Sequence, residues 1–155
     1  MKIAVIQIRG KIGLSKKLKD TLAMLRLYKK NSCVVVDANP TFIGMANLLK
    51  DYVTWGEVSE DTFKLLLEKR GKIVGNKPLT ENFLKEKTKM GYDEFVKSFY
   101  NNKIKLKDVP GFKPFFRLCP PVGGFERNGV KYSFSMGGVL GYRKDKINDL
   151  IRKML

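Results

Sequence analysis

The chain has 155 residues, of which 31 are Lys or Arg and 15 are Asp or Glu, so its formal net charge is +16. Its hydrophobic fraction of 43% and aromatic fraction of 11% are too high for a disordered basic tail, and we expect a globular protein. The absence of His removes the commonest general base and metal ligand, and with them every Ser-His or Cys-His nucleophile. We therefore expect no enzyme, no cofactor and no metal ion.

The large excess of positive charge predicts a polyanionic partner. Basic side chains repel one another in the free protein but gain free energy by displacing counterions from a phosphate backbone. The alternative is a surface that is charged only for solubility. No uncharged stretch is long enough to cross a bilayer, and no segment pairs a basic face with an exposed Trp/Phe face. We expect a cytoplasmic protein that binds nucleic acid, with no membrane and no small-molecule substrate.

The first half of the chain predicts three strands and two helices in the order β-α-β-α-β. Residues 2–9 alternate polar and apolar side chains, many of them β-branched, which is typical of a strand. Apolar residues recur at helical spacing after Ser15, a favourable N-cap, and again after Pro40. We expect strands at 2–9, 33–36 and 52–55, a helix over 16–28 and a second helix that starts at 39–41. The alternation of strands and helices along the chain by itself favours a parallel sheet.

The second half predicts helices separated by an irregular segment. Ser59 and Thr80 are expected N-caps, and apolar residues at helical spacing predict helices over 92–100 and 147–155, the latter capped by Asp145. Residues 110–143 between them hold half of the 14 Gly and four of the six Pro, and Asn128-Gly129 predicts a two-residue β-hairpin there. This segment either folds over its own domain or packs into a groove of a large partner.

Two groups of basic residues are candidate contacts to RNA. Residues 10–16 resemble a phosphate-binding loop but lack the Walker A spacing, so only a weaker anion site at a helix N-terminus remains, the alternative being a plain turn. Basic residues beside aromatics in and after the Gly/Pro-rich segment fit structured RNA, which offers stacking faces and backbone phosphates. The candidates are Arg9, Lys11, Lys16 and Lys17 in the first group and Arg117, Arg127, Lys131, Arg143 and Lys144 in the second.

The two cysteines are far apart in the sequence. Cys33 lies in a Val-rich strand and Cys119 precedes Pro120-Pro121, where it could be exposed. We expect both thiols to be reduced, and buried rather than joined in a disulfide.

Several runs of residues resemble a known family. They are Ile8-Arg9-Gly10, Asn39-Pro40-Thr41, Asp51 to Glu57, Pro120 to Glu126 and Leu140-Gly141-Tyr142-Arg143. Taken in this order, they are similar to the large-subunit ribosomal protein L-thirty family, whose eukaryotic counterpart is L-seven. The resemblance covers the whole chain, and because bacterial members end near the third strand it points to the archaeal form. The chain departs from the family at Cys119, where a His is usual.

The resemblance implies an α+β fold. Its core, residues 1–58, would be β-α-β-α-β with a small three-stranded antiparallel sheet in the order three-one-two, a relative of the ferredoxin-like fold. Residues 59–155 would form a helical, Gly/Pro-rich extension packed on that core.

The implied role is that of a structural, non-catalytic constituent of the large ribosomal subunit. It would act in translation, bind rRNA near the 5S rRNA and contact neighbouring ribosomal proteins. The alternative is an RNA-binding factor in ribosome assembly or RNA processing.

Overall fold

A computed structural model describes residues 1–155 and contains five strands and six α-helices. The strands are β1 (Lys2–Gln7), β2 (Ser32–Asp37), β3 (Val53–Glu57), β4 (Phe116–Arg117) and β5 (Gly141–Tyr142). The α-helices are α1 (Lys16–Met24), α2 (Pro40–Leu48), α3 (Glu60–Arg70), α4 (Glu81–Thr88), α5 (Tyr92–Tyr100) and α6 (Ile147–Met154). Short 3-10 turns η1 to η4 cover Val74–Asn76, Gly129–Lys131, Phe134–Met136 and Lys144–Lys146.

The strands form one mixed sheet in the order β4-β2-β1-β3-β5. β1 is antiparallel to both β2 and β3, which confirms the antiparallel three-one-two arrangement that the family resemblance implied. The expected three-stranded sheet is too small, because β4 adds to β2 and β5 adds parallel to β3. Both added strands have two residues each, too short to leave an alternating pattern in the sequence.

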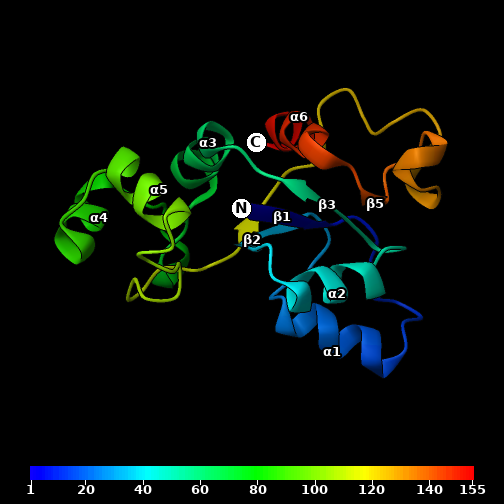
Figure 1. Ribbon diagram of the computed structural model, residues 1–155, viewed down its shortest axis with the longest axis horizontal. Helices are drawn as coiled ribbons and strands as arrows, with labels where there is room; N and C mark the ends of the chain where they lie inside the picture. Colours follow the sequence, from blue (N-terminus) through cyan, green and yellow to red (C-terminus); the bar gives the residue numbers. More distant parts are fainter.

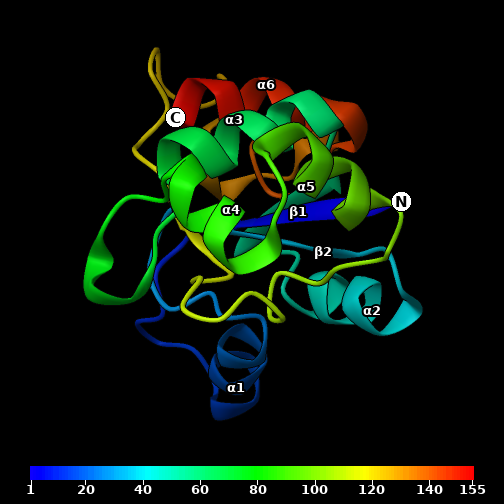
Figure 2. The ribbon, with the colours of Figure 1, turned by 90° about the vertical axis from the view of Figure 1, so that its left-hand side faces the viewer.

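The central strand is buried on both of its faces. Ile3 and Val5 of β1 point into a core shared with α1 and α2, whereas Ala4 and Ile6 point into a larger core with α3, α5 and α6. Figures 1 and 2 show α1 and α2 on one side of the sheet and α3, α5 and α6 on the other. The extension therefore covers one of the two faces of the sheet with apolar side chains. The division of the chain into a core, residues 1–58, and an extension, residues 59–155, stays a prediction.

A buried cation fastens the end of α5 to the sheet. Lys2 is only 3% exposed, and its ammonium group forms an ion pair with Asp37. The same Lys2 Nζ donates a hydrogen bond to Asn102 Oδ1 at 2.6 Å and lies 4.2 Å from the centroid of the Phe99 ring. Because all three partners face one amine, the α5 terminus and the first two strands are held in a single geometry.

Most of the expected helix ends are confirmed. Ser59 Oγ accepts a hydrogen bond from the Thr62 amide and Thr80 Oγ1 accepts one from the Phe83 amide, both at 3.4 Å. Helix α1 ends at Met24 rather than 28, because the chain turns through a left-handed residue, Arg26, at φ 59°. Helix α6 begins after the turn η4, with Lys146 rather than Asp145 at its N-cap.

The predicted hairpin at Asn128-Gly129 is wrong. The 3-10 turns η2 and η3 occupy this segment instead, and the amide of Asn128 Nδ2 donates to the Met136 carbonyl at 2.6 Å. The loop closes where Val139 N donates to the Tyr132 carbonyl at 3.1 Å. A Cβ on Gly138 would lie 2.1 Å from that same carbonyl oxygen, so only glycine fits at this closure.

Both cysteines are free. Cys33 is fully buried, as expected, and burial raises the pKa of its thiol to about 12. Cys119 is exposed, so the expectation that both thiols are buried is wrong for this residue, and its Sγ lies 3.0 Å from Nη2 of Arg70.

Candidate nucleic-acid interface

The strand register gathers basic turns at one end of the sheet. Gln7 at the end of β1 pairs with Val53 at the start of β3, and Ile6 pairs with Cys33 near the start of β2. The segments that follow β1, precede β2 and precede β3 therefore meet at this end. They carry five basic residues, and β4 adds a sixth, Arg117, opposite Ser32 at the start of β2. We call these six residues the basic end of the sheet: Arg9, Lys11, Lys29, Lys30, Lys50 and Arg117.

Aromatic rings support two of these cations. The Arg9 guanidinium lies 5.1 Å from the centroid of the Tyr52 ring, and its Nη1 donates to the Asp51 carbonyl at 3.2 Å. Lys11 Nζ lies 5.7 Å from the ring of Tyr28, and partial desolvation lowers the pKa of Lys11. The Arg9 contacts hold the β1–α1 loop against the turn before β3, and the Lys11 contact holds it against the segment before β2, while Arg9 itself stays exposed.

The loop between β1 and α1 is open. Gly13 has φ +75°, and no atom lies within 4 Å of the position that a Cβ would take on Gly10 or Gly13. Ile12 between them is fully exposed. Lys16 and Lys17 are exposed in the first turn of α1, where the N-cap Ser15 makes no side-chain hydrogen bond. The helix N-terminus is therefore accessible, and an anion there remains a prediction.

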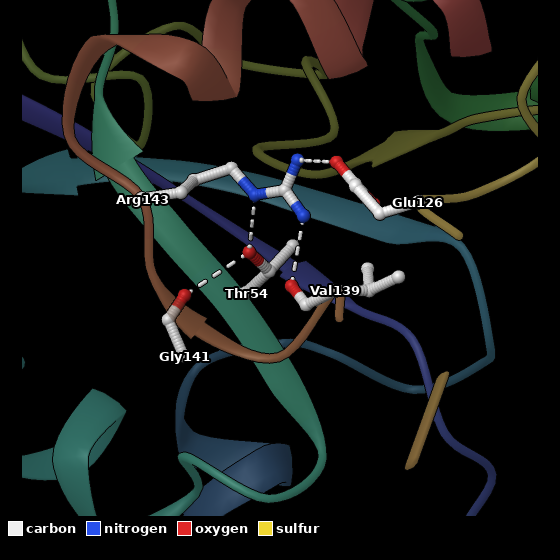
Figure 3. Close-up of polar contacts among 5 residues, drawn as sticks. All are labelled: Thr54, Glu126, Val139, Gly141 and Arg143. Carbon is white, nitrogen blue, oxygen red and sulfur yellow. Dashed lines mark hydrogen bonds and ion pairs between the residues drawn. The ribbon is translucent and has the colours of Figure 1, made fainter. Parts of the chain in front are cut away.

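Arg143 is not available to RNA, which corrects its place among the candidates. It is 2% exposed, and Figure 3 shows its guanidinium directed at Thr54, Glu126 and Val139. Nε donates to Thr54 Oγ1 at 2.9 Å, Nη1 pairs with Glu126 Oε1 at 2.6 Å, and Nη2 donates to the Val139 carbonyl at 2.8 Å. The ring of Phe134 lies 4.7 Å from the guanidinium carbon. We call these contacts the Arg143 clamp; they hold the Gly/Pro-rich segment on β3.

The sequence contained a signal for this clamp. Glu126 is the only acidic residue between 110 and 143, and a lone carboxylate among basic residues is a natural partner for a buried arginine. The neighbours of the two ion-pair partners, Arg127 and Lys144, are exposed. The clamp therefore fixes the backbone from which these two basic side chains reach the solvent.

The remaining candidates divide by position. Arg117 lies on β4 opposite Ser32, at the basic end of the sheet, and Lys131 ends the turn η2. Both side chains are exposed. Lys29, Lys30 and Lys50 were not among the residues predicted to contact RNA. Their position in the turns just before two predicted strands could have indicated that they lie together at this end of the sheet.

A pair of stacked aromatics joins the extension to β3. Trp55 and Tyr142 are opposite one another in the β3–β5 pair, with ring centroids 4.5 Å apart and planes inclined by 34°. Tyr142 is 43% exposed and its hydroxyl donates to the Glu57 carboxylate. That hydrogen bond raises the pKa of Tyr142 to about 12.

The fold and this surface define a class of protein: a basic α+β domain whose exposed chemistry is concentrated positive charge. No helix has the length and apolarity needed to cross a membrane. The profile of a family described as "Ribosomal protein L30p/L7e" matches residues 3–53.

Full-length relatives extend this match. The "Large ribosomal subunit protein uL30" of Methanopyrus kandleri is 44% identical over 149 residues, covering 96% of this chain and 100% of the relative. Proteins of the same name from Methanococcus maripaludis and Nanoarchaeum equitans are 48% and 42% identical, covering 100% and 98% of this chain and 100% and 97% of theirs. The chain belongs to the ribosomal protein L30p/L7e family.

Proposed function

We propose that this protein is a structural constituent of the large ribosomal subunit that binds rRNA through backbone phosphates and RNA shape. The observation that carries the proposal is the basic end of the sheet, where three turns and strand β4, far apart in sequence, present six basic side chains together. Full-length relatives named as large-subunit proteins support the ribosomal setting.

The exposed basic residues are proposed to act in two groups. Arg9, Lys11, Lys16 and Lys17 would contact phosphates around the β1–α1 loop. Arg117, Arg127, Lys131 and Lys144 would lie along RNA from β4 and the Gly/Pro-rich segment, which the Arg143 clamp holds in place. Such contacts position a protein on RNA without reading bases. We further propose, as the family resemblance implies, that this contact lies near the 5S rRNA and beside neighbouring ribosomal proteins.

Salt dependence tests the phosphate contacts. If five or more of these residues neutralise phosphates, log affinity falls with log salt at a slope of roughly −4 or steeper. The measurement is binding of the full chain to deproteinised large-subunit rRNA over a salt series. A slope near −1 contradicts the assignment.

Charge-matched variants test where the contacts lie. Replacing Arg9 and Arg117 by Gln is expected to flatten the slope by about two, since each removes one phosphate contact. The control replaces Lys87 and Lys97, exposed on α4 and α5 away from the basic end, and removes the same charge. Equal effects of the two pairs would contradict a localised interface.

Sedimentation of cell lysate tests the ribosomal role itself. A structural constituent stays with mature large subunits at about one copy each and leaves only after RNase or very high salt. An assembly or processing factor would instead appear in light or precursor fractions, and that result would replace the proposal.

A further inference from the structure

A cavity lies between the core and the Gly/Pro-rich segment, beside the basic end of the sheet. Its volume is about 360 Å³, within the range of roughly 300–1,000 Å³ that ligand sites usually have. One wall comes from the turn between α2 and β3, with Lys50 and Asp51, and from Trp55 of β3. The opposite wall comes from residues 131–142, so the cavity exists only because the extension folds back onto β3.

The apolar wall of this cavity is aromatic. Trp55, Phe134 and Tyr142 all line it. Tyr142 packs against the Trp55 ring, with the two ring centroids 4.5 Å apart, and 43% of its surface remains exposed. Phe134 is fixed from behind by the guanidinium of Arg143 at 4.7 Å. A flat ligand that stacks on Tyr142 would extend an aromatic pair that the fold already holds rigid. Rigid aromatic platforms of this kind suit nucleobases, each of which offers a π-face.

The polar groups of the cavity suit the rest of a nucleotide. Lys50 and Lys131 are exposed on two sides of the opening and Asp51 is the one carboxylate among the lining residues. The backbone carbonyl of Asp51 accepts a hydrogen bond from the exposed Arg9, which brings a further positive charge close to the cavity. Ser133 and Ser135 hydroxyls, 3.0 Å apart, line the cavity as donors or acceptors for a ribose. Two lysines around an aromatic wall combine phosphate and base contacts in one place.

One residue of this wall also carries a buried polar atom without a partner. Trp55 is 7% exposed, and its indole Nε1 is buried without a hydrogen-bond partner. A buried N–H without a partner is unfavourable, and such groups in native proteins call for an explanation such as a missing ligand or water.

We propose that this cavity binds one unpaired nucleotide, with its base stacked on Tyr142 and its phosphates held by Lys50 and Lys131. The site rests on the proposed RNA-binding function and adds to it a point where the protein takes a base out of the RNA stack. An RNA strand and a free nucleotide share this chemistry, and the charge of the adjoining basic end favours the strand. Recognition of unstacked bases by aromatic side chains is the usual way in which proteins read irregular RNA.

Trp55 provides the assay, because it is the only tryptophan of the chain. Its emission is followed while the full-length protein is titrated with deproteinised archaeal large-subunit rRNA, with an unstructured six-nucleotide RNA and with each of the four nucleoside monophosphates. A change in emission on rRNA binding is expected. A change of equal midpoint with a monophosphate would identify a free nucleotide as the occupant, and no change with any probe overturns the site.

Matched variants separate stacking from overall binding. Tyr142→Leu is expected to lower rRNA affinity roughly 10-fold, because it removes one base–aromatic stack. Tyr142→Phe keeps the ring and should bind within about twofold of wild type. Tyr132→Leu is the control, since Tyr132 is 53% exposed on the same segment but does not line the cavity. Equal binding by Tyr142→Leu and Tyr132→Leu overturns the proposal.

A measurement on the unaltered protein guards against a Tyr142→Leu variant that fails to fold. Ultraviolet cross-linking of the wild-type rRNA complex, read by mass spectrometry, should give a nucleotide adduct on Tyr142 or Phe134. Adducts confined to other residues contradict the site. Failure of the wild-type protein to bind rRNA at all refutes the proposed function, whereas normal rRNA binding without effects at Tyr142 refutes only the nucleotide site.

Discussion

Replacing Arg143 by Met tests the corrected role of this residue. Methionine retains an unbranched side chain but leaves the Glu126 carboxylate and the buried Val139 carbonyl without the partners they have at 2.6 and 2.8 Å. Breaking a buried ion pair by removal of one partner destabilises a protein by about 3–5 kcal/mol. The Glu126 side chain is 30% exposed and can regain part of its hydration, so we expect the lower end, about 3 kcal/mol.

Urea unfolding of the full chain measures this change, and two further variants apportion it. Arg143→Lys keeps the charge but not the planar fork, and should lose about half as much free energy of unfolding. In a double-mutant cycle, Arg143→Met and Glu126→Gln should be coupled by at least about 1 kcal/mol. The reasoning is refuted if Arg143→Met unfolds within about 1 kcal/mol of wild type. Lower RNA affinity without a stability change would instead restore Arg143 as an RNA ligand.

Three more predictions concern packing and protonation. Gly56→Ala would place a Cβ 2.1 Å from the Lys144 carbonyl oxygen and should lower the free energy of unfolding by at least about 2 kcal/mol, whereas Gly44→Ala, with no atom near its Cβ position, should not destabilise. A fragment of residues 1–58 exposes Ile6 and Val35 and should show no cooperative thermal unfolding; a sharp transition would contradict this. The thiol of Cys33 has its pKa raised by burial to about 12, so the stability it contributes is present below pH 9 and lost as the pH rises. Wild type should therefore lose stability relative to Cys33→Ala by about 1.4 kcal/mol per pH unit between pH 9 and about pH 12, and parallel pH profiles would refute this.

The elements that could be predicted are those with long periodic patterns. The strand predicted at 2–9 is β1, which ends two residues earlier at Gln7, and the helices predicted at 92–100 and 147–155 are α5 and α6, the latter ending at Met154. The direction of the strands could not be predicted from periodicity, because an alternating pattern reads the same in parallel and antiparallel sheets; the family resemblance supplied it. Strands β4 and β5 and the turns η2 and η3 depend on contacts with β2, β3 and Arg143, which two-residue or three-residue segments cannot encode locally.

The sequence predicted that the candidate interface consists of exposed basic residues, but not which basic residues are excluded from it. Eight of the nine proposed residues are at least partly exposed, since a basic residue in a loop is usually solvated. Arg143 has the same sequence context, with Tyr142 and Lys144 beside it, and is buried because Glu126 and Thr54 face it from other elements. The nucleotide cavity could not be predicted for the same reason, since Lys50 and Lys131 are far apart in sequence and line the same cavity only in the folded chain.

The position of β4 and β5 affects how the chain folds as the ribosome makes it. The N-terminal strands β1, β2 and β3 leave the ribosome first, yet the residues that flank β2 and β3 in the finished sheet are 116–117 and 141–142. Thr54, for example, hydrogen bonds to the Gly141 carbonyl at 3.0 Å, a partner made 87 residues later. Contacts this distant in sequence form slowly, and open strand edges invite pairing with other chains. The nascent protein therefore has both edges uncovered from the completion of β3 until β4 is made, a period in which a bound chaperone would prevent aggregation.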